Sequence, residues 1–243
     1  MGFGSARSTP SPTMLLAGLV GEGWASTVAD AAAAGADLFL LSGRPNEKEL
    51  KEAISAAEDR PCGLLTPQAG AKEVAQLGEA GLDFVVLAPE APAAALQDQE
   101  LAVLLQVNDD ITDIQLRTID PLPLEAIYFE PDAAPLTIRR QMELQRISGM
   151  TRKPLLLRVQ PDAEQQDLLA LREAGVGLAA VDLKEPGALD ALRRLRGVID
   201  ALPSRRRPRR EDRPEITLPR GAPAEPGEEA EEEPPTPGSE APA

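Results

Sequence analysis

The sequence contains no histidine and only one cysteine, and these scarcities exclude several kinds of chemistry. Without imidazole there is no Ser-His-Asp or Cys-His device, no His-ligated zinc or iron site and no histidine acid–base catalysis. Cys62 cannot form an internal disulfide or a thiolate cluster, so no residue requires an oxidising compartment, and we expect a cytoplasmic protein. Any reaction must therefore use carboxylates, lysine, arginine or hydroxyl groups.

Aromatic residues and long apolar runs are also scarce. Aromatic residues make up 2% of the chain, which leaves few side chains to stack on bases or sugars. The net charge of -15 argues against nucleic acid as a partner, since a polyanion would approach against the field of the whole molecule. The apolar run 14–20 is too short to cross a bilayer, and Glu22 and Asp30 interrupt the stretch after it. We therefore expect no membrane segment.

The composition changes after Pro203. Residues 204–243 contain nine prolines and almost no large apolar side chains, with arginines clustered in 205–213 and acidic residues in 225–240. Such a segment cannot bury enough apolar surface to offset the entropy of ordering it, so we predict a disordered, Pro-rich, charged tail. With a flexible leader expected over residues 1–12, residues 13–203 form the predicted folded domain.

One short pattern recurs three times in this domain: a helical stretch ends at a glycine, and an apolar run begins soon after it. The copies are Ala33-Ala-Gly-Ala-Asp-Leu-Phe-Leu-Leu41, Glu79-Ala-Gly-Leu-Asp-Phe-Val-Val-Leu87 and Glu173-Ala-Gly-Val-Gly-Leu-Ala-Ala-Val181. A glycine in this place is typical of a helix C-cap in the left-handed conformation, which predicts that role for Gly35, Gly81 and Gly175. Helix starts are indicated by capping-box spacing in Asn46 with Glu49 and in Asp162 with Gln165.

Short apolar runs predict eight strands. They lie at about 14–20, 37–42, 62–66, 83–88, 101–107, 125–130, 154–159 and 176–183. The runs are almost continuously hydrophobic, as strands covered on both faces are, and most are separated by enough residues for one helix. The intervals after the fourth and fifth runs are the weakest, because Pro89, Pro92, Pro121 and Pro123 leave little room for a helix.

Alternating strands and helices imply a parallel sheet, either closed or open. Eight units in a domain of this length favour a small closed (β/α)8 barrel of the TIM type over an open, doubly wound sheet. The stretch Gly21-Glu22-Gly23-Trp24 lacks the third glycine of a dinucleotide-binding fingerprint, which gives the Rossmann alternative little support. In the barrel, Cys62 would start the third strand at the end that serves stability, where a thiol is buried and inert.

The active sites of such barrels lie at the carboxyl ends of the strands, so the candidate site residues are those that end each run. Asp182 and Lys184 end the last run and are the candidate catalytic pair, with Lys184 as proton donor and Asp182 orienting it. Arg158, Arg44 and Asn108 are the candidate substrate-binding residues. The guanidinium of either arginine can hold an anionic group. The alternative is that Asp182 caps the next helix and Lys184 is simply solvated.

The stretch Val181-Asp-Leu-Lys-Glu-Pro-Gly187 resembles the Asp-x-Lys strand ends of orotidine-phosphate decarboxylase-like barrels and, less closely, the Asp-x-Lys-x-Pro stretch of a methanofuran-precursor synthase barrel. The Ala-Gly-x-Asp strand starts at 34–37 and 80–83 also look like those of phosphate-binding barrels. This resemblance implies lyase or decarboxylase chemistry. The glycine loops that hold phosphate in those barrels are missing, since Gln160-Pro-Asp-Ala163 and Lys184-Glu-Pro-Gly187 stand in their place. We therefore expect neither flavin nor a phosphosugar, and no resident cofactor.

A divalent cation is the other hypothesis for this rim. Oxygen ligands of the kind that Mg²⁺ or Mn²⁺ prefers follow the fifth, sixth and eighth runs: Asp109, Asp110, Glu130, Asp132 and Asp182. Spacing in the sequence does not show that these carboxylates converge.

Two functions therefore stay open. The first is a lyase, decarboxylase or isomerase that acts on a small anionic metabolite through the Lys184–Asp182 pair. The second is a catalytically silent barrel, used as a scaffold, whose tail 204–243 binds a protein partner. The missing histidine and phosphate loops favour the scaffold, whereas the prevalence of enzymes among such barrels favours catalysis.

Overall fold

A computed structural model describes residues 14–21, 23–97, 101–129 and 135–203 of the chain. The predicted leader and the predicted tail lie outside the described residues, and so do Glu22, Glu130 and Asp132.

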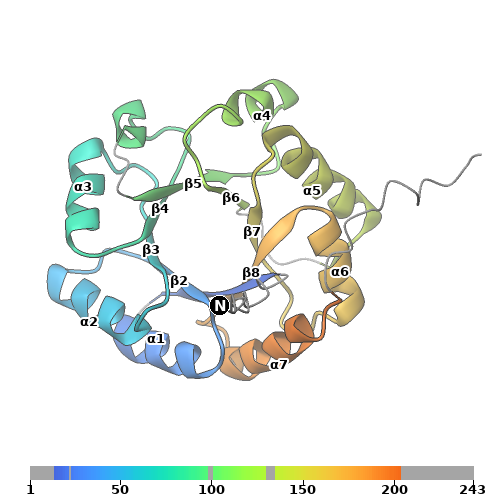
Figure 1. The fold of residues 1–243 in the computed structure, drawn as a ribbon, viewed down its shortest axis with the longest axis horizontal. Coiled ribbons are helices and arrows are strands. Elements are labelled where there is room, and N and C mark those ends of the chain that lie inside the picture. Colours follow the sequence, from blue (N-terminus) through green and yellow to red (C-terminus); the bar gives the residue numbers. More distant parts are fainter. Residues whose placement is uncertain (1–13, 22, 98–100, 130–134, 204–243) are drawn as a thin grey trace, which may run out of the picture. The chain divides into compact units, whose positions relative to one another are not determined.

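Eight parallel strands form a closed barrel in chain order, with the last strand paired to the first (Figure 1). The strands are β1 (Leu15–Val20), β2 (Leu38–Ser42), β3 (Cys62–Leu65), β4 (Phe84–Leu87), β5 (Ala102–Val107), β6 (Ala126–Phe129), β7 (Leu155–Arg158) and β8 (Val176–Asp182). Each predicted apolar run contains one of them, so the prediction of a (β/α)8 TIM-type barrel is confirmed.

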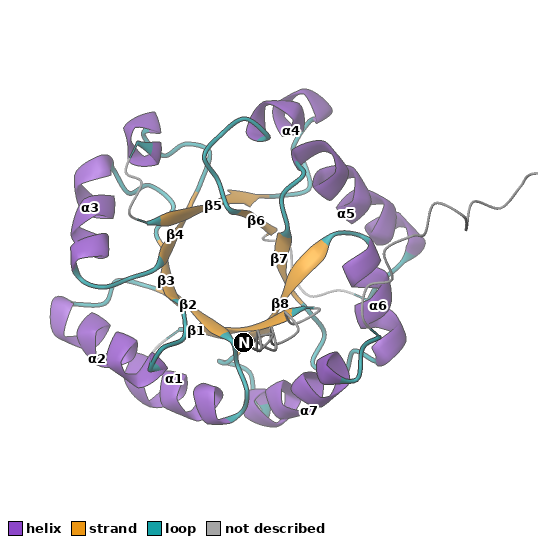
Figure 2. Cartoon of the chain, in the orientation of Figure 1, coloured by secondary structure: helices purple, strands orange, loops and turns teal. Residues whose placement is uncertain are grey.

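Helices surround the barrel on the outside (Figure 2). In the part of the chain that the structure describes, they are α1 (Trp24–Ala33), α2 (Glu47–Ala57), α3 (Ala71–Glu79), α4 (Asp113–Ile119), α5 (Ile138–Thr151), α6 (Gln165–Glu173) and α7 (Ala188–Asp200). The connection after β4 contains a short 3₁₀ helix, η1 (Ala93–Leu96), which follows Pro92. The two weak intervals of the sequence thus hold η1 and the seven-residue helix α4.

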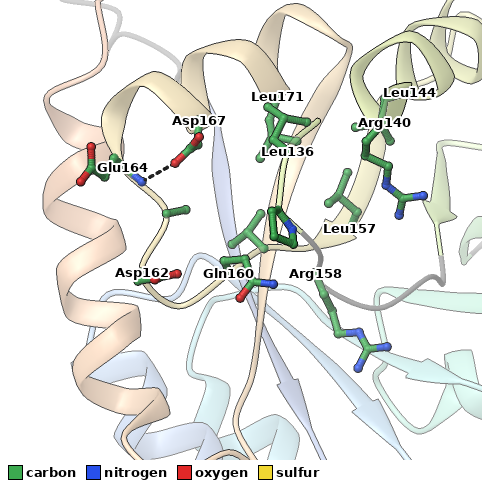
Figure 3. Close-up of a pocket in the computed structure, with 13 residues that line it drawn as sticks. Leu136, Arg140, Leu144, Leu157, Arg158, Gln160, Asp162, Glu164, Asp167 and Leu171 are labelled. Carbon is green, nitrogen blue, oxygen red and sulfur yellow. Dashed lines mark hydrogen bonds between the residues drawn. The ribbon is translucent and has the colours of Figure 1, made fainter. Parts of the chain in front are cut away.

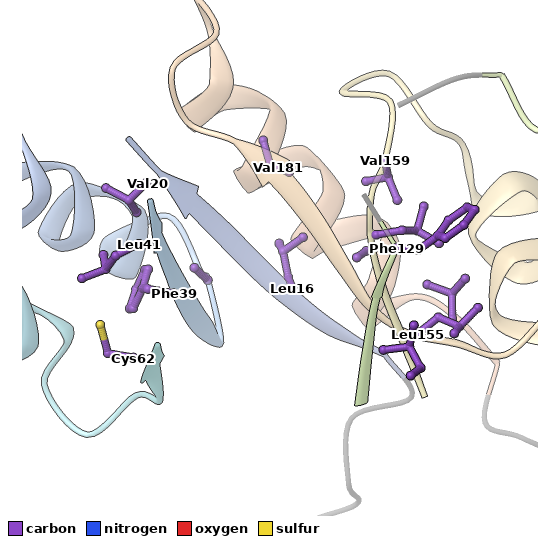
Figure 4. Close-up of a cluster of buried hydrophobic side chains, with 14 of the residues drawn as sticks. Leu16, Val20, Phe39, Leu41, Cys62, Phe129, Leu155, Val159 and Val181 are labelled. Atoms are coloured by element: carbon purple, nitrogen blue, oxygen red, sulfur yellow. The ribbon is translucent and has the colours of Figure 1, made fainter. Parts of the chain in front are cut away.

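Alternating residues of each strand build two apolar layers. Side chains that face inward, such as Leu40, Val86 and Leu156, fill the barrel interior. Side chains that face outward, such as Leu16 and Phe129, pack between the strands and the helices (Figure 4). Burying a side chain of this size contributes roughly 1.5–3 kcal/mol, so both layers are needed to stabilise the closed sheet.

The glycines of the repeated pattern have the predicted conformation. Gly35, Gly81 and Gly175 have φ values of 98°, 96° and 98°, in the left-handed region that a Cβ disfavours. Each directly follows the C-cap residue of α1, α3 or α6 and turns the chain into the next strand.

The two predicted capping boxes had different outcomes. Asn46 caps α2 and exchanges both hydrogen bonds with Glu49, as predicted. The box from Asp162 to Gln165 was wrong, because α6 begins only at Gln165 and has Glu164 as its N-cap. There the Asp167 carboxylate accepts the backbone N–H of Glu164 at 3.0 Å. Both pairs have the same spacing, and the chain uses the one two residues later.

None of the described helices is both long enough and apolar enough to cross a membrane.

Candidate functional site

The last residues of β7 and β8 bring two of the predicted site residues together at the carboxyl-terminal end of the barrel. Arg158 is two residues beyond Leu156, and Asp182 is two beyond Ala180, both of which face the interior. Side chains alternate along a strand, so Arg158 and Asp182 also face inward. Arg158 Nη1 lies 3.7 Å from Asp182 Oδ2, and each side chain keeps about a quarter of its surface exposed, 26% and 27%.

Lys184 lies in the turn after β8 and reaches across to the end of β1. Its backbone N–H donates to Asp182 Oδ1 at 3.0 Å. Its side chain passes over Gly21, where an added Cβ would lie 1.7 Å from Lys184 Cε and 2.9 Å from Nζ. Gly21 thus makes room for the lysine, and three charged residues meet where β7, β8 and β1 end.

The carboxylate of Asp182 contacts Lys184 through the lysine's backbone N–H. In the described part of the chain, its ion-pair partner is Arg158, and its hydrogen bond with Lys184 goes to the main-chain nitrogen. Asp182 therefore fixes the turn that carries Lys184 and attracts the guanidinium beside it. The sequence predicted that Asp182 orients Lys184, and in the structure the Asp182 carboxylate is paired with Arg158 and accepts the backbone N–H of Lys184.

A cavity of about 430 Å³ opens beside Arg158, between β7, α5 and α6 (Figure 3). Leu144, Leu157 and Leu171 form its apolar wall. The guanidinium groups of Arg140 and Arg158 lie on the same side of the view, while the carboxylates on and before α6 lie on the other. The cavity thus has two arginines on one side and carboxylates on the other.

Arg140 is a site residue that the sequence reasoning missed. It stands in the first turn of α5, where Nη1 lies 2.9 Å from Asp109 Oδ1 and 3.2 Å from Glu143 Oε2. Its guanidinium carbon is 4.3 Å from the centre of the Phe129 ring, a cation–π contact. Arg140 lies on a helix and not at a strand end, so its position in the sequence gave no signal of a site residue.

Two polar side chains inside the barrel were missed as well. Gln106 on β5 and Tyr128 on β6 are register partners on the inward-facing side of their strands. Gln106 Oε1 is buried and has no hydrogen-bond partner within the described part of the chain. A polar residue in the inward register of Ala102 and Leu104 was the signal that could have identified Gln106.

The other two predicted substrate-binding residues lie in cavities of their own. Arg44 borders a cavity of about 570 Å³ beyond the ends of β2 and β3. Asn108 borders one of about 280 Å³ beyond the ends of β4 and β5, together with Gln106 and Glu90. The structure thus brings together Arg158, Asp182 and Lys184 where β7, β8 and β1 end, and it leaves Arg44 and Asn108 at other cavities.

Of the carboxylates proposed for a divalent cation, those that the structure describes do not converge. Among the described residues there is no cluster of three or more acidic or cysteine side chains that could hold a metal ion. Asp109 is paired with Arg140, and Asp182 with Arg158. Glu130 and Asp132 lie outside the described residues, so their part of the hypothesis stays a prediction.

Cys62 begins β3 at the opposite end of the barrel from the candidate site, and its side chain is fully buried. Burial, with a smaller contribution from the nearby negative charge of Asp83, raises the pKa of the thiol from 9.0 to about 12. Because the thiolate is the reactive form, the cysteine is inert near neutral pH, as the sequence predicted.

Comparisons with known proteins identify the fold. No family model matches the chain, and no curated protein matches it in sequence. Among solved structures, a variant of the tryptophan synthase alpha-subunit from Pyrococcus furiosus is similar over 77% of this chain and 97% of its own, with a TM-score of 0.59 and 13% identity. KGPDC from Streptococcus mutans covers the same shares, with a TM-score of 0.63 and 12% identity. At such identities the likeness concerns the fold alone: the chain is a TIM barrel that structurally resembles these two enzymes.

Proposed function

We propose that the protein is an enzyme that binds a small anionic metabolite where β7, β8 and β1 end, and acts on it as a lyase, decarboxylase or isomerase. The observation that carries the proposal is the position of Lys184, held over Gly21 beside the Arg158–Asp182 pair. Two cations of different character stand on one side of the barrel. The guanidinium keeps its charge, whereas the ammonium can give up a proton.

The three residues would divide the work. Arg158 binds the anionic group of the substrate, because a guanidinium offers two parallel N–H donors to a carboxylate. Asp182 acts as a positioning residue, since it holds the Lys184 backbone and attracts Arg158. Lys184 stabilises negative charge that develops on the substrate and then donates a proton to it.

A 3-oxo acid illustrates the step. The bond between its carboxylate and C2 breaks, the electron pair moves into an enolate and carbon dioxide leaves. The Lys184 ammonium then protonates C2, and water restores the proton to the lysine. Support for such chemistry comes from the fold, because TIM-barrel enzymes have their sites at this end of the strands. The solved structures of similar fold include tryptophan synthase alpha-subunits, which are enzymes by name.

The test is carbon dioxide release from a panel of short 3-oxo acids. Lys184→Ala should lower kcat by about 100-fold or more, the usual contribution of a general acid. Arg158→Gln should raise KM by roughly ten-fold, because it removes a charge-assisted hydrogen bond to the substrate. Lys48→Ala and Arg193→Gln are the matched controls, since both residues form exposed ion pairs away from the site.

Equal kinetics in wild type and both site variants would contradict the proposal. If a protein partner also co-purified with the full chain but not with residues 1–203, the scaffold function would replace the enzymatic one. The tail 204–243 lies outside the described residues, so partner binding through it stays a prediction.

A further inference from the structure

A second cavity at the carboxyl-terminal end of the barrel lies between α2 and α3, which are neighbours on the outer ring (Figure 1). Its volume of about 570 Å³ lies within the range of small-molecule sites. Leu50 of α2, Leu64 of β3 and Leu77 of α3 supply an apolar wall. The cavity thus joins apolar surface between two helices to the polar turns that follow β2 and β3.

Two charged residues line this cavity, Arg44 and Glu73, and Trp24 holds the turn that carries Arg44. Gly43 has a φ of 109°, and an added Cβ there would lie 3.3 Å from Trp24 Cζ2. The indole Nε1–H of Trp24 donates to the Ser42 carbonyl oxygen at 3.2 Å. Trp24 thus supports the residues directly before Arg44.

Arg44 is exposed, and it forms no ion pair with any acidic residue that the structure describes, in contrast to Arg140 and Arg158. Glu73 lines the same cavity from α3 without pairing with it. An apolar wall with an exposed guanidinium at its polar end is complementary to a ligand with an apolar chain and a single negative charge that lies at the turn after β2. Glu73, on α3, disfavours a second negative charge on the ligand, and Arg44 opposes a positive head group placed at that turn.

We propose that this cavity binds an unbranched aliphatic monocarboxylate, with the carboxylate at Arg44 and the chain between α2 and α3. The site is separate from the one proposed for catalysis, since none of Arg158, Asp182 and Lys184 lines this cavity. It gives Arg44 a ligand of its own, distinct from the metabolite at Arg158.

Octanoate is the probe, titrated into the full-length protein by calorimetry and by tryptophan fluorescence. Trp24 is the sole tryptophan of the chain and underlies the turn before Arg44, so its emission reports on this site. We expect saturable heat and a change in Trp24 emission over the same concentration range. Affinity should fall about four-fold for each methylene removed on going to heptanoate and hexanoate, because each buried methylene contributes about 0.8 kcal/mol.

Variants separate this site from the other. Arg44→Gln should weaken octanoate binding by about ten-fold or more, the effect of losing one charge-assisted hydrogen bond. Arg193→Gln, which removes the same charge from α7, and Arg158→Gln should leave the affinity unchanged. Octylammonium should bind more weakly than octanoate to the wild type.

Four results would overturn the proposal: no saturable heat at millimolar octanoate, no dependence on chain length, equal affinity for octylammonium, or an Arg44→Gln protein that binds as the wild type does. Loss of octanoate binding in Arg158→Gln would move the ligand to the catalytic site. If the 3-oxo acid test fails while octanoate still binds, the proposed catalytic function is wrong and the inference about this cavity still holds.

Discussion

Asp37 and Leu16 form a closed pair of hydrogen bonds between the starts of β2 and β1. The Asp37 carboxylate accepts the backbone N–H of Leu16 at 2.7 Å, and the backbone N–H of Asp37 donates to the Leu16 carbonyl at 2.8 Å. Asp83 and Cys62 repeat the arrangement between β4 and β3, at 2.8 and 2.9 Å. The aspartate of the repeated sequence pattern therefore serves to align neighbouring strands.

Asp37→Ala should lower the free energy of unfolding by about 2–4 kcal/mol, because it leaves a buried backbone N–H without its acceptor and removes the carboxylate partner of Arg196. Asp83→Ala, which loses only the backbone contact, should cost about 1–2 kcal/mol. Urea unfolding of both variants measures the two values. An Asp37→Ala protein as stable as the wild type, or less affected than Asp83→Ala, would contradict the strand-aligning role.

The glycine after α6 is expected to be less replaceable than the glycine before α7. Both have positive φ, 98° at Gly175 and 77° at Gly187, so alanine at either position carries backbone strain of about 1–2 kcal/mol. A Cβ on Gly175 would also lie 1.9 Å from Ser148 Oγ and 2.3 Å from its Cβ, whereas one on Gly187 would meet nothing within 4 Å. The collision with Ser148 should add to the cost at Gly175 alone.

Thermal unfolding of the two alanine variants gives this comparison directly. Gly187→Ala serves as the control that isolates backbone strain, and the Gly175→Ala protein should unfold at a clearly lower temperature. Equal melting temperatures would show that Ser148 moves aside without cost.

Cys62 should not react with a thiol reagent in the native protein. Because burial raises the pKa of the thiol to about 12, the folded protein keeps the proton at pH values where the unfolded chain, with a pKa near 9.0, has lost it. This contribution to stability is therefore complete below pH 9 and is lost as the pH rises from 9 towards 12. Dithionitrobenzoate at pH 8 should react only as fast as the protein opens, and at once in guanidinium chloride.

Fast labelling of the native protein would contradict the burial of Cys62. The Cys62→Ala variant is the control, since a chain without cysteine gives no colour at all. Its stability should also lose the part of the alkaline pH dependence that comes from the thiol.

The fold was predictable because its signals are local and repeated. The glycines at 35, 81 and 175 indicate helix ends from their immediate neighbours alone, and each apolar run can be recognised as a strand by itself. The capping box at Asp162 failed because two overlapping pairs, Asp162 with Gln165 and Glu164 with Asp167, have the same spacing. The sequence alone does not decide between them.

The site was less predictable, because cavities form between elements that are distant in sequence. Arg158, Asp182 and Lys184 were identified from their place at strand ends, but the choice of Arg158 as partner of Asp182 depends on the register of β7 and β8. Arg140 came from a helix, and its position over Phe129 requires α5 to lie against the end of β6. Arg44 has the same strand-end signal as Arg158, and no sequence pattern places the two in separate cavities.

The packing of Lys184 over Gly21 predicts that the two positions are energetically coupled. Gly21 does not have positive φ, so the backbone tolerates alanine, which by itself stabilises a protein by about 0.4–1 kcal/mol through the unfolded chain. In the wild type, Gly21→Ala forces the lysine side chain out of its place, and the gain should disappear or turn into a loss. In a Lys184→Ala background the obstacle is gone, and Gly21→Ala should stabilise the protein.

Urea unfolding of the four proteins gives the coupling energy between the two positions, expected at about 1 kcal/mol for residues in direct contact. Strictly additive effects would show that the Lys184 side chain is not held over Gly21, and the proposed function would lose the observation that carries it.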